Sequence, residues 1–436
     1  MSEPATAPSE STKSTKEVPE SLRQQRGLVN ESFKNLAKKF EEYTIWNWSN
    51  PISSVDLTCN IEAVNELENK ILPLLCQQLN TLSKLLDPSS ELPEDMIASK
   101  LQLITEIQSE LNQTTDQVLS LSAGVKREED SPVTQANDQD LKESKQFRRQ
   151  GLSIKLRLMK HQLFLIFKLC FQTTKEFELR SSTNPTVVAA PLHPNRHNFN
   201  DDTDSYGVLE RTAHVIESID RVIQWIIGHE FILIQEKWGT SVDSYDRQLV
   251  ELTELINREI RPPKPEDGNR TSRDPSSRSL NQHATPVAQS LIPLTKLSRL
   301  FLKKIAKNGL NQIPSKSFTD MSSCQLATLS DSADSLDIFF YEIMRSITEY
   351  DSNNGIDPPN PSKPIDDLIH DMTRSLDSSV LLVITHVIPL ITDSNSSPNL
   401  LQNYLVQWNN LFLLAAQNCI RAADSYRAAQ AAETDE

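Results

Sequence analysis

Histidines and acidic residues, the side chains most often used in metal binding and acid–base catalysis, are dispersed along this sequence. His193 and His197 stand four apart, shortly before Asp201 and Asp202. A metal ion needs ligands that the fold holds in fixed geometry, and residues 181–206, with three prolines, predict no element to hold them. Most of the other histidines lie singly on predicted helices. We therefore predict no catalytic residue and no metal site.

Glycine-rich loops that could hold a phosphate or a cofactor are also missing. The chain has 9 glycines in 436 residues, far below the roughly 7% that is usual in proteins. No GxxxxGK[ST], GxGxxG or GxSxG motif occurs, so nucleotide loops and hydrolase elbows are excluded. The sequence therefore predicts no cofactor and argues against an enzyme.

One cluster of positive charge interrupts a chain of net charge −15. Its seven cations fall within nineteen residues and are opposed by Glu143 alone. An exposed cluster of this kind would bind an acidic protein, RNA or an anionic lipid surface; the alternative is the solvated face of an amphipathic helix without a ligand. Phe147 is the one aromatic residue within it, which gives little support for stacking on single-stranded RNA. The cluster consists of Lys142, Lys145, Arg148, Arg149, Lys155, Arg157 and Lys160.

A second local pattern predicts regulation. Val125-Lys126-Arg127-Glu128 fits the apolar-Lys-x-Glu acceptor pattern for conjugation of SUMO, and Ser131-Pro132 follows an acidic stretch. Phosphorylation of Ser131 would add negative charge beside Lys126 and favour a basic conjugating surface. We therefore treat Lys126 and Ser131 as candidate modification sites, the alternative being a chance match in a charged linker.

The elements that must position these residues are long helices. Apolar residues recur every three or four positions, and proline, acidic residues and glycine mark several helix ends. Pro73 and Pro293 fall inside helices and are expected to bend them. Residues 163–171 are apolar nearly all round and predict a buried segment. The predicted helices span residues 19–44, 61–86, 93–124, 141–180, 207–238, 242–260, 285–309, 317–350, 364–392 and 397–430, with 207–238 and 242–260 either separate or joined in one bent rod.

The fold class that follows is all-α, with long amphipathic helices in up-and-down bundles. We expect two bundles, an N-terminal one over residues 20–180 and a C-terminal one over 207–432. Segments rich in Pro, Ser and charged residues predict a disordered tail and linkers, because they lack apolar residues to offset the entropy of ordering. These are residues 1–19, 125–140, 181–206 and 262–284.

The location of the protein can be inferred from what the sequence lacks. The N-terminus has no apolar signal region, and the longest apolar runs are too short to span a bilayer. The cysteines show no metal-binding spacing, which favours buried free thiols in a reducing compartment. We expect a cytoplasmic or nuclear protein that is not secreted and has no transmembrane segment. The five cysteines are Cys59, Cys76, Cys170, Cys324 and Cys419.

Three helical segments carry a resemblance to a known family: LVNESFKNLAKKFEEY, SLIPLTKLSRLFLKKIAKNGLN and LLQNYLVQWNNLFLLAAQNCIRAADSY. With the acidic charge and the acidic linker of the N-terminal bundle, they resemble the cyclin-D-binding protein family, whose helical bundles are of the vinculin and catenin type. The resemblance implies a non-enzymatic binding protein that contacts cell-cycle or transcription regulators. It carries over no functional residue.

The sequence leaves three hypotheses for function. The first is a protein-interaction scaffold whose bundles present grooves to partner helices, with protein partners and no cofactor. The second is a binder of RNA or an anionic membrane through residues 142–160, although the acidic chain disfavours nucleic acid. The third is an enzyme with an unrecognised site among the helices. The sequence identifies neither a partner nor an oligomeric state.

Overall fold

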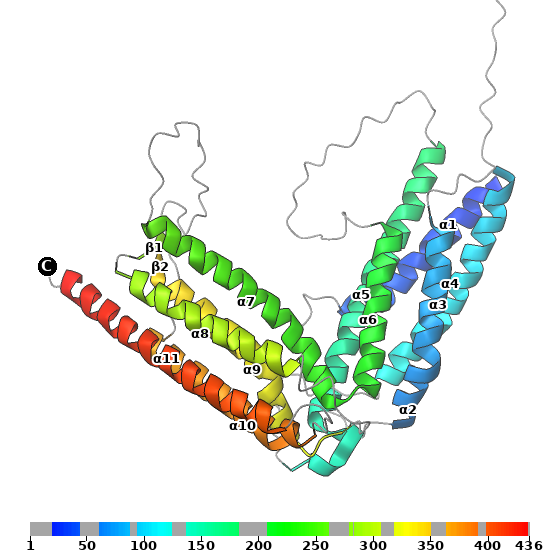
Figure 1. Ribbon diagram of the computed structural model, residues 1–436. Helices are drawn as coiled ribbons and strands as arrows, with labels where there is room; N and C mark the ends of the chain where they lie inside the picture. Colours follow the sequence, from blue (N-terminus) through cyan, green and yellow to red (C-terminus); the bar gives the residue numbers. More distant parts are fainter. Residues whose placement is uncertain are drawn as a thin grey trace, which may run out of the picture. The chain divides into compact units, whose positions relative to one another are not determined.

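The computed structural model confirms the all-α prediction (Figure 1). The chain is almost entirely helical over the residues that the structure describes, apart from a short antiparallel pairing of β1 (Ser279–Leu280) with β2 (Thr348–Glu349). The predicted tail 1–19 and most of the three predicted linkers lie outside the described residues. The described residues are 20–43, 61–87, 94–123, 137–182, 207–260, 279–281, 283–306, 318–349, 363–390 and 398–434.

The chain forms two compact units, which we call the N-terminal and the C-terminal unit. The first comprises residues 1–127 and 151–226, and the second comprises residues 128–150 and 227–436. This differs from the boundary expected at 181–206, because α6 (Val208–Ile227) belongs to the N-terminal unit. Proline-rich composition marks where helices end. It does not show which helices share a core.

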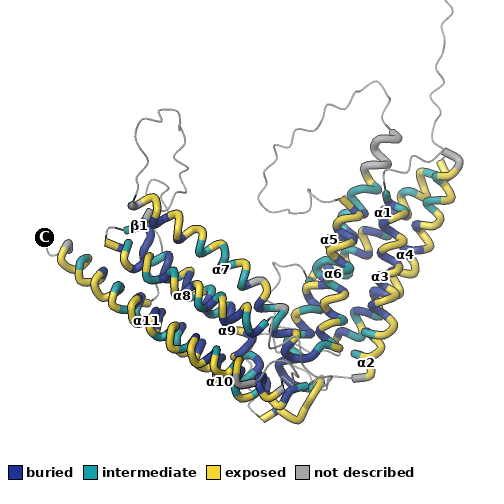
Figure 2. The backbone as a smooth tube through the Cα atoms, viewed as in Figure 1, coloured by how far each residue is buried: buried dark blue, intermediate teal, exposed yellow. Residues whose placement is uncertain are grey.

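The N-terminal unit is built from helices with buried apolar faces (Figure 2). Gln108 donates to the carbonyl of Val29 at 2.9 Å and Lys39 to that of Asn112 at 3.1 Å, so α1 and α4 run parallel. The ring of Phe167 on α5 stacks on Phe40, with centroids 6.1 Å apart. The unit contains α1 (Glu20–Lys39), α2 (Ile61–Glu66), α3 (Leu72–Leu85), α4 (Glu94–Ala123), α6 and most of α5 (Gln146–Ser182).

The C-terminal unit is a bundle of five long helices. α7 packs against α8 and α9, and α10 packs against both α9 and α11. α11 returns to α8, where Trp408 donates to the carbonyl of Leu297 at 2.8 Å and stacks on Phe412. The helices are α7 (Glu230–Ile260), α8 (Thr285–Lys304), α9 (Ser323–Ile347), α10 (Ile365–Leu382) and α11 (Pro398–Thr434); the short helix η4 (Gln139–Ser144) and the start of α5 also belong to this unit.

Two prolines are each accompanied by a wide helical turn. The π-helix η3 (Leu67–Ile71) lies just before Pro73, and η7 (Val383–Val387) lies just before Pro389 in the 3₁₀ turn η8 (Ile388–Leu390). Proline lacks an N–H and its ring crowds the preceding turn, which a wider turn accommodates. The irregularity expected at Pro73 is therefore present as a π turn. At Pro293, in contrast, α8 continues on both sides.

The break between α6 and α7 falls at Gly228–His229. The sequence predicted either a break after Gly239 or one bent rod through it, and Gly239 lies inside α7 with open space around it. A glycine inside an exposed helix costs only about 1 kcal/mol relative to alanine. The buried face of α7, which includes Trp238, Tyr245 and Leu252, runs through this position. That continuous face offsets the cost, so the helix does not end there.

The described ends of two predicted linkers are ordered and buried. Asp138 is fully buried, as is Ala284, and Leu280 in β1 is nearly so. The predicted linkers 125–140 and 262–284 are therefore too long at their C-terminal ends. A composition rich in Pro, Ser and charge does not reveal single residues that anchor a segment to a distant helix.

Gly151 on α5 provides a test of packing in the N-terminal unit. A Cβ placed there would lie 1.8 Å from Cζ2 of Trp225, which is mostly buried. Gly151→Ala should therefore destabilise the protein by about 1–3 kcal/mol, despite the better helix propensity of alanine. The matched control is Gly27→Ala on α1, where nothing lies within 4 Å and we expect a gain of about 0.5–1 kcal/mol. Urea denaturation measures both; equal stabilisation by the two substitutions would contradict the packing.

Candidate functional site

The seven cations predicted to form a basic patch do not form a surface. Lys145, Arg148, Arg157 and Lys160 are buried, and of the seven only Lys142 is exposed. Arg149 and Lys155 are partly buried, and Lys155 lies over the ring of Trp225 at 5.7 Å. Neither sequence interpretation holds, because the cluster is neither a docking patch nor a solvated face. Charge in the sequence does not show where the partner of each charge lies.

Lys145 forms a buried ion pair. Its Nζ lies 3.2 Å from Oε2 of Glu230 at the start of α7, and both side chains have 0% exposure. The same Nζ donates to the carbonyl of Thr319 at 2.7 Å. Thr319 in turn donates to Glu230 through its N–H at 2.8 Å and its hydroxyl at 2.6 Å. These contacts satisfy the charges that burial would otherwise leave uncompensated.

Asp138 forms the second half of this arrangement. Its carboxylate accepts hydrogen bonds from the backbone N–H of Gln146 at 3.0 Å and of Ser323 at 2.7 Å, and from the Ser323 hydroxyl. Those N–H groups are unpaired donors in the first turns of α5 and α9, so one carboxylate caps two helices. The Ser323 hydroxyl also accepts from the N–H of Phe147 at 2.8 Å.

We call this network the polar junction; its members are Asp138, Lys145, Arg148, Glu230, Thr319 and Ser323. Arg148 completes it by donating to the carbonyl of Gly228 at 2.9 Å and lying over the ring of Phe318 at 5.0 Å. Burial lowers the pKa of Arg148 from its usual value, and Glu230 and Glu143 oppose this shift. The side chains that resemble catalytic groups are thus buried and hydrogen-bonded, Lys145 and Thr319 to Glu230, Ser323 to Asp138 and Arg148 to the backbone, which is the arrangement of a structural anchor.

His229 lies beside the junction and is held neutral. Burial, and then the charges of Arg148 and Lys145, lower its pKa to about 4. Its Nδ1 accepts from the N–H of Phe231 at 3.2 Å, which requires an unprotonated Nδ1. Burial also lowers the pKa of His161, beside Arg211, and of His386. None of these three has the raised pKa that would suit a general acid at neutral pH.

The protein should lose stability as pH falls through the titration range of His229. Its pKa in the fold, about 4, is below the ordinary value of 6.5, so the unfolded chain takes up the proton first. This contribution is complete above about pH 6.5 and decreases between pH 6.5 and 4. His229→Asn keeps an acceptor for Phe231 and should flatten the pH profile of the unfolding free energy in that window. His214→Asn, at an exposed position on α6, is the control; identical profiles for both variants would refute this assignment.

Three of the four described cysteines, Cys76, Cys170 and Cys419, are poorly suited to nucleophilic chemistry. Burial raises the pKa of Cys170 far above its usual range, and raises that of Cys76 and Cys419 to about 11. The reactive form of cysteine is the thiolate, which is scarce at neutral pH under these conditions. Cys76, Cys170, Cys324 and Cys419 are free thiols, as the sequence predicted, but only Cys170 and Cys419 are buried, whereas Cys76 and Cys324 are half-buried. Cys59 lies outside the described residues.

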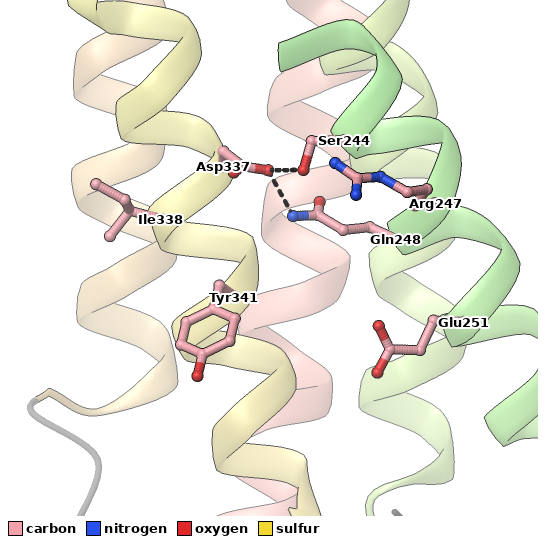
Figure 3. A pocket seen from close by; sticks show the side chains of 7 residues that line it. All are labelled: Ser244, Arg247, Gln248, Glu251, Asp337, Ile338 and Tyr341. Carbon is pink, nitrogen blue, oxygen red and sulfur yellow. Dashed lines mark hydrogen bonds between the residues drawn. The ribbon is translucent and has the colours of Figure 1, made fainter. Parts of the chain in front are cut away.

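An open groove lies between α7 and α9 in the C-terminal unit (Figure 3). Lys237 contacts Asp331 at 2.6 Å, and Gln248 contacts Asp337 at 2.7 Å. The residue numbers of the contacting pairs thus increase in the same direction along both helices. The two helices therefore run parallel. A row of polar contacts joins them over this length, formed by Lys237, Ser241, Ser244 and Gln248 on α7 and by Asp331, Asp334 and Asp337 on α9.

The groove has a volume of about 550 Å³ and two unlike walls. Arg247 and Glu251 form the α7 wall, and Ile338 and Tyr341 form the α9 wall. The two apolar side chains are 59% and 49% exposed. Arg247 is exposed and forms no ion pair with any described residue. Asp337 is already bonded to Ser244 and Gln248, so Arg247 is the available charged donor of the α7 wall.

Sequence reasoning did not identify this groove. The signal for it lies in α9, where Leu336, Phe340 and Ile343 form the buried stripe. Ile338 and Tyr341 are large apolar residues off that stripe, and they face solvent. Only the packing of α9 beside α7 shows that both side chains border the same groove as Arg247.

Several sequence-based sites lie outside the described residues. Lys126 and Ser131 remain a predicted modification site, and His193 and His197 cannot be placed. Among the residues that are described, no group of three or more His, Cys, Asp or Glu side chains could hold a metal ion. Over the same residues, no helix is both long enough and apolar enough to cross a bilayer.

The structure therefore defines a protein of two helical units, and comparison with known families also gives two matches, although residues 128–150 of the C-terminal unit fall within the N-terminal match. Residues 60–227 are similar to a domain of unknown function, DUF8723, and residues 229–421 to a second one, DUF8721. The junction between the two matches agrees with the unit boundary at residues 226–227. No curated protein matches the chain. The resemblance to the cyclin-D-binding family stays a prediction.

Proposed function

We propose that this chain is a non-enzymatic protein-interaction scaffold whose C-terminal unit binds a partner helix in the α7–α9 groove. The observation that carries the proposal is the composition of that groove, which is lined by exposed apolar side chains and by an exposed cation that forms no ion pair with any described residue. Ile338 and Tyr341 offer apolar surface, and Arg247 offers a charged donor across from them. Exposed apolar surface rimmed by polar residues is characteristic of interaction sites.

The chemistry of the groove specifies its partner. Two parallel helices leave a furrow into which the ridge of a third helix packs, and helix-in-groove binding uses apolar anchors one turn apart. The partner should therefore be an amphipathic helix that places such anchors against Ile338 and Tyr341. A carboxylate on its flank would accept hydrogen bonds from Arg247.

The two alternative functions receive less support. Binding of RNA or anionic membrane through residues 142–160 required an exposed basic face, and most of those cations are buried. An enzyme would need reactive groups accessible to substrate, whereas the reactive groups of the polar junction are fully or nearly buried. We retain cell-cycle or transcription regulators as the expected class of partner, acting in the cytoplasm or nucleus, on the strength of the family resemblance alone.

Substitutions in the groove should remove a specific set of partners. The tagged full-length chain is purified from its own cells as wild type, Ile338→Asp and Arg247→Glu. The control is Leu103→Asp, which changes an equally exposed leucine on α4 of the other unit. We expect proteins bound by the wild type and by Leu103→Asp to be lost from both groove variants. All four chains should show the same circular dichroism, because exposed substitutions change stability little.

Direct binding then confirms the site. A peptide spanning the interacting helix of a protein lost in this way should bind the purified wild type. Ile338→Asp should weaken that binding at least about tenfold, since it removes an apolar anchor and introduces a charge. Recovery of the same proteins by all four chains would show that the groove is not the binding site.

A further inference from the structure

The charged residues of the C-terminal unit are unevenly distributed among its helices. α7 contains seven Asp and Glu residues, and α9 and α10 contain four each. α8 contains none, and the stretch 398–420 of α11, which packs against α8 (Figure 1), contains no charged residue at all. α8 instead carries four cations, which are Lys296, Arg299, Lys303 and Lys304, the first and third of them exposed. The side formed by α8 and this stretch of α11 thus contributes no negative charge, in a chain of net charge −15.

The cations of α8 are only partly neutralised by their neighbours. Asp246 on α7 pairs with Arg299 and lies 3.7 Å from Lys303, so a single carboxylate serves two cations. Lys304 lies over the ring of Tyr404 on α11 at 5.3 Å, and that ring carries no charge. Positive charge therefore remains at the surface beside the uncharged stretch of α11.

Exposed leucines lie beside these cations. Leu411 and Leu414 on α11 are 56% and 53% exposed, and Leu300 on α8 is 47% exposed. Trp408 bonds to the carbonyl of Leu297, so this part of α11 lies beside the middle of α8, where the cations are. Side chains this exposed project outward from helices whose other faces are packed in the bundle. We call this surface the α8–α11 face; its members are Lys296, Leu300, Lys303, Lys304, Leu411 and Leu414.

We propose that the α8–α11 face binds peripherally to an anionic membrane surface. The cations select a negatively charged partner, and the absence of acidic residues on both helices removes the repulsion that such a partner meets elsewhere on this chain. Leucines that project singly offer no furrow into which a partner helix could pack, whereas lipids rearrange around them. Lysines beside leucines are the composition of helices that lie in the headgroup region, with leucines at the acyl boundary and lysines at the lipid phosphates.

The acidic helices of the unit would orient this contact. Their carboxylates belong to α7, α9 and α10, and not to the two helices of the face. Exposed charges more than about 10 Å apart are largely screened at physiological salt. Repulsion of α7, α9 and α10 from an anionic surface therefore turns the α8–α11 face towards it, while the local attraction of the cations persists.

The α8–α11 face shares no residue with the α7–α9 groove, so the two proposals are independent. A scaffold that does not bind membranes would still bind a partner helix in its groove. A chain that binds membranes through α8 and α11 would hold that groove, and any partner in it, at the membrane surface. The variants below separate the two.

Flotation of the full-length chain with lipid vesicles tests the charge of the face. The wild type should bind vesicles of phosphatidylcholine with about 30% phosphatidylserine, and should not bind vesicles of phosphatidylcholine alone. Lys296→Glu with Lys303→Glu should weaken binding at least about tenfold, because four units of charge are reversed at the surface. The matched control is Lys34→Glu with Lys38→Glu at exposed positions on α1, which changes the net charge equally and should alter binding less than about threefold.

A second pair of substitutions tests the leucines without changing charge. Leu411→Gln with Leu414→Gln keeps good helix formers on α11 and should also weaken binding at least about tenfold, because two apolar side chains no longer enter the bilayer. Ile338→Asp, in the α7–α9 groove, should bind vesicles like the wild type. All chains should show the same circular dichroism, because the substituted positions are exposed.

Three outcomes would overturn the proposal. The first is a wild type that does not bind the anionic vesicles. The second is an equal loss in the α1 control and the α8 pair, which would make the effect one of net charge alone. The third is a wild type that binds polyglutamate but no vesicle, which would identify an acidic protein as the occupant of the face. Added salt should weaken vesicle binding by the wild type, since it screens the lysines from the lipid headgroups.

Discussion

Replacing Lys145 by methionine should destabilise the C-terminal unit by about 3–5 kcal/mol, since it leaves the Glu230 carboxylate buried without its cation. Lys145 and Glu230 have 0% exposure, and the Oε1 atom of Glu230 already accepts no hydrogen bond from a described residue. Thr319 would continue to donate to the carboxylate, but two neutral donors do not replace a charge. Urea denaturation of the full chain measures the loss.

A variant with both substitutions distinguishes the loss of the Lys145–Glu230 ion pair from a general packing defect. Lys145→Met with Glu230→Gln removes both charges, so it should be less destabilised than the sum of the two single variants, by at least about 1 kcal/mol. The surface control is Lys34→Met, which breaks the exposed pair with Glu31 at 3.4 Å and should change stability by no more than about 0.5 kcal/mol. Additive losses in the cycle would show that Lys145 and Glu230 do not stabilise one another.

Changing Phe167 to aspartate should cost at least about 4 kcal/mol. Phe167 has 0% exposure and stacks on Phe40, so the change removes an aromatic ring from the core and puts an unpaired carboxylate in its place. We expect the N-terminal unit to unfold or to melt far below the wild type in a thermal scan followed by circular dichroism.

The carboxylate gives this prediction a second readout. A buried aspartate has a raised pKa, so the folded variant binds a proton more readily than the unfolded chain does. The penalty relative to the wild type should therefore shrink as pH is lowered towards 4. Leu158→Asp on the same helix, at an exposed position, should cost under about 1 kcal/mol. Equal losses in the two variants would mean that residue 167 does not lie in the core.

The sequence by itself determined the helices. The all-α class, the start of α4 after Pro93 and the long α9 and α11 were all visible, because a helix is made by contacts three and four residues apart. The prediction of a buried segment at 163–171 was correct for Leu163, Ile166, Phe167 and Cys170, whereas the other five residues of the segment are only half-buried. The free thiols also followed from spacing alone.

The tertiary structure decided how those helices are grouped and which polar residues are buried. α6 joins the N-terminal unit through packing such as that of Trp225 on Gly151, which lies 74 positions earlier in the chain. Lys145 is buried rather than exposed because Glu230, 85 residues away, supplies its counter-charge. The groove exists because α9 lies beside α7. The periodicity of the sequence shows which face of a helix is apolar. Only the fold shows which distant residue contacts that face or pairs with a given charge, and a charge can be buried only where such a partner is present.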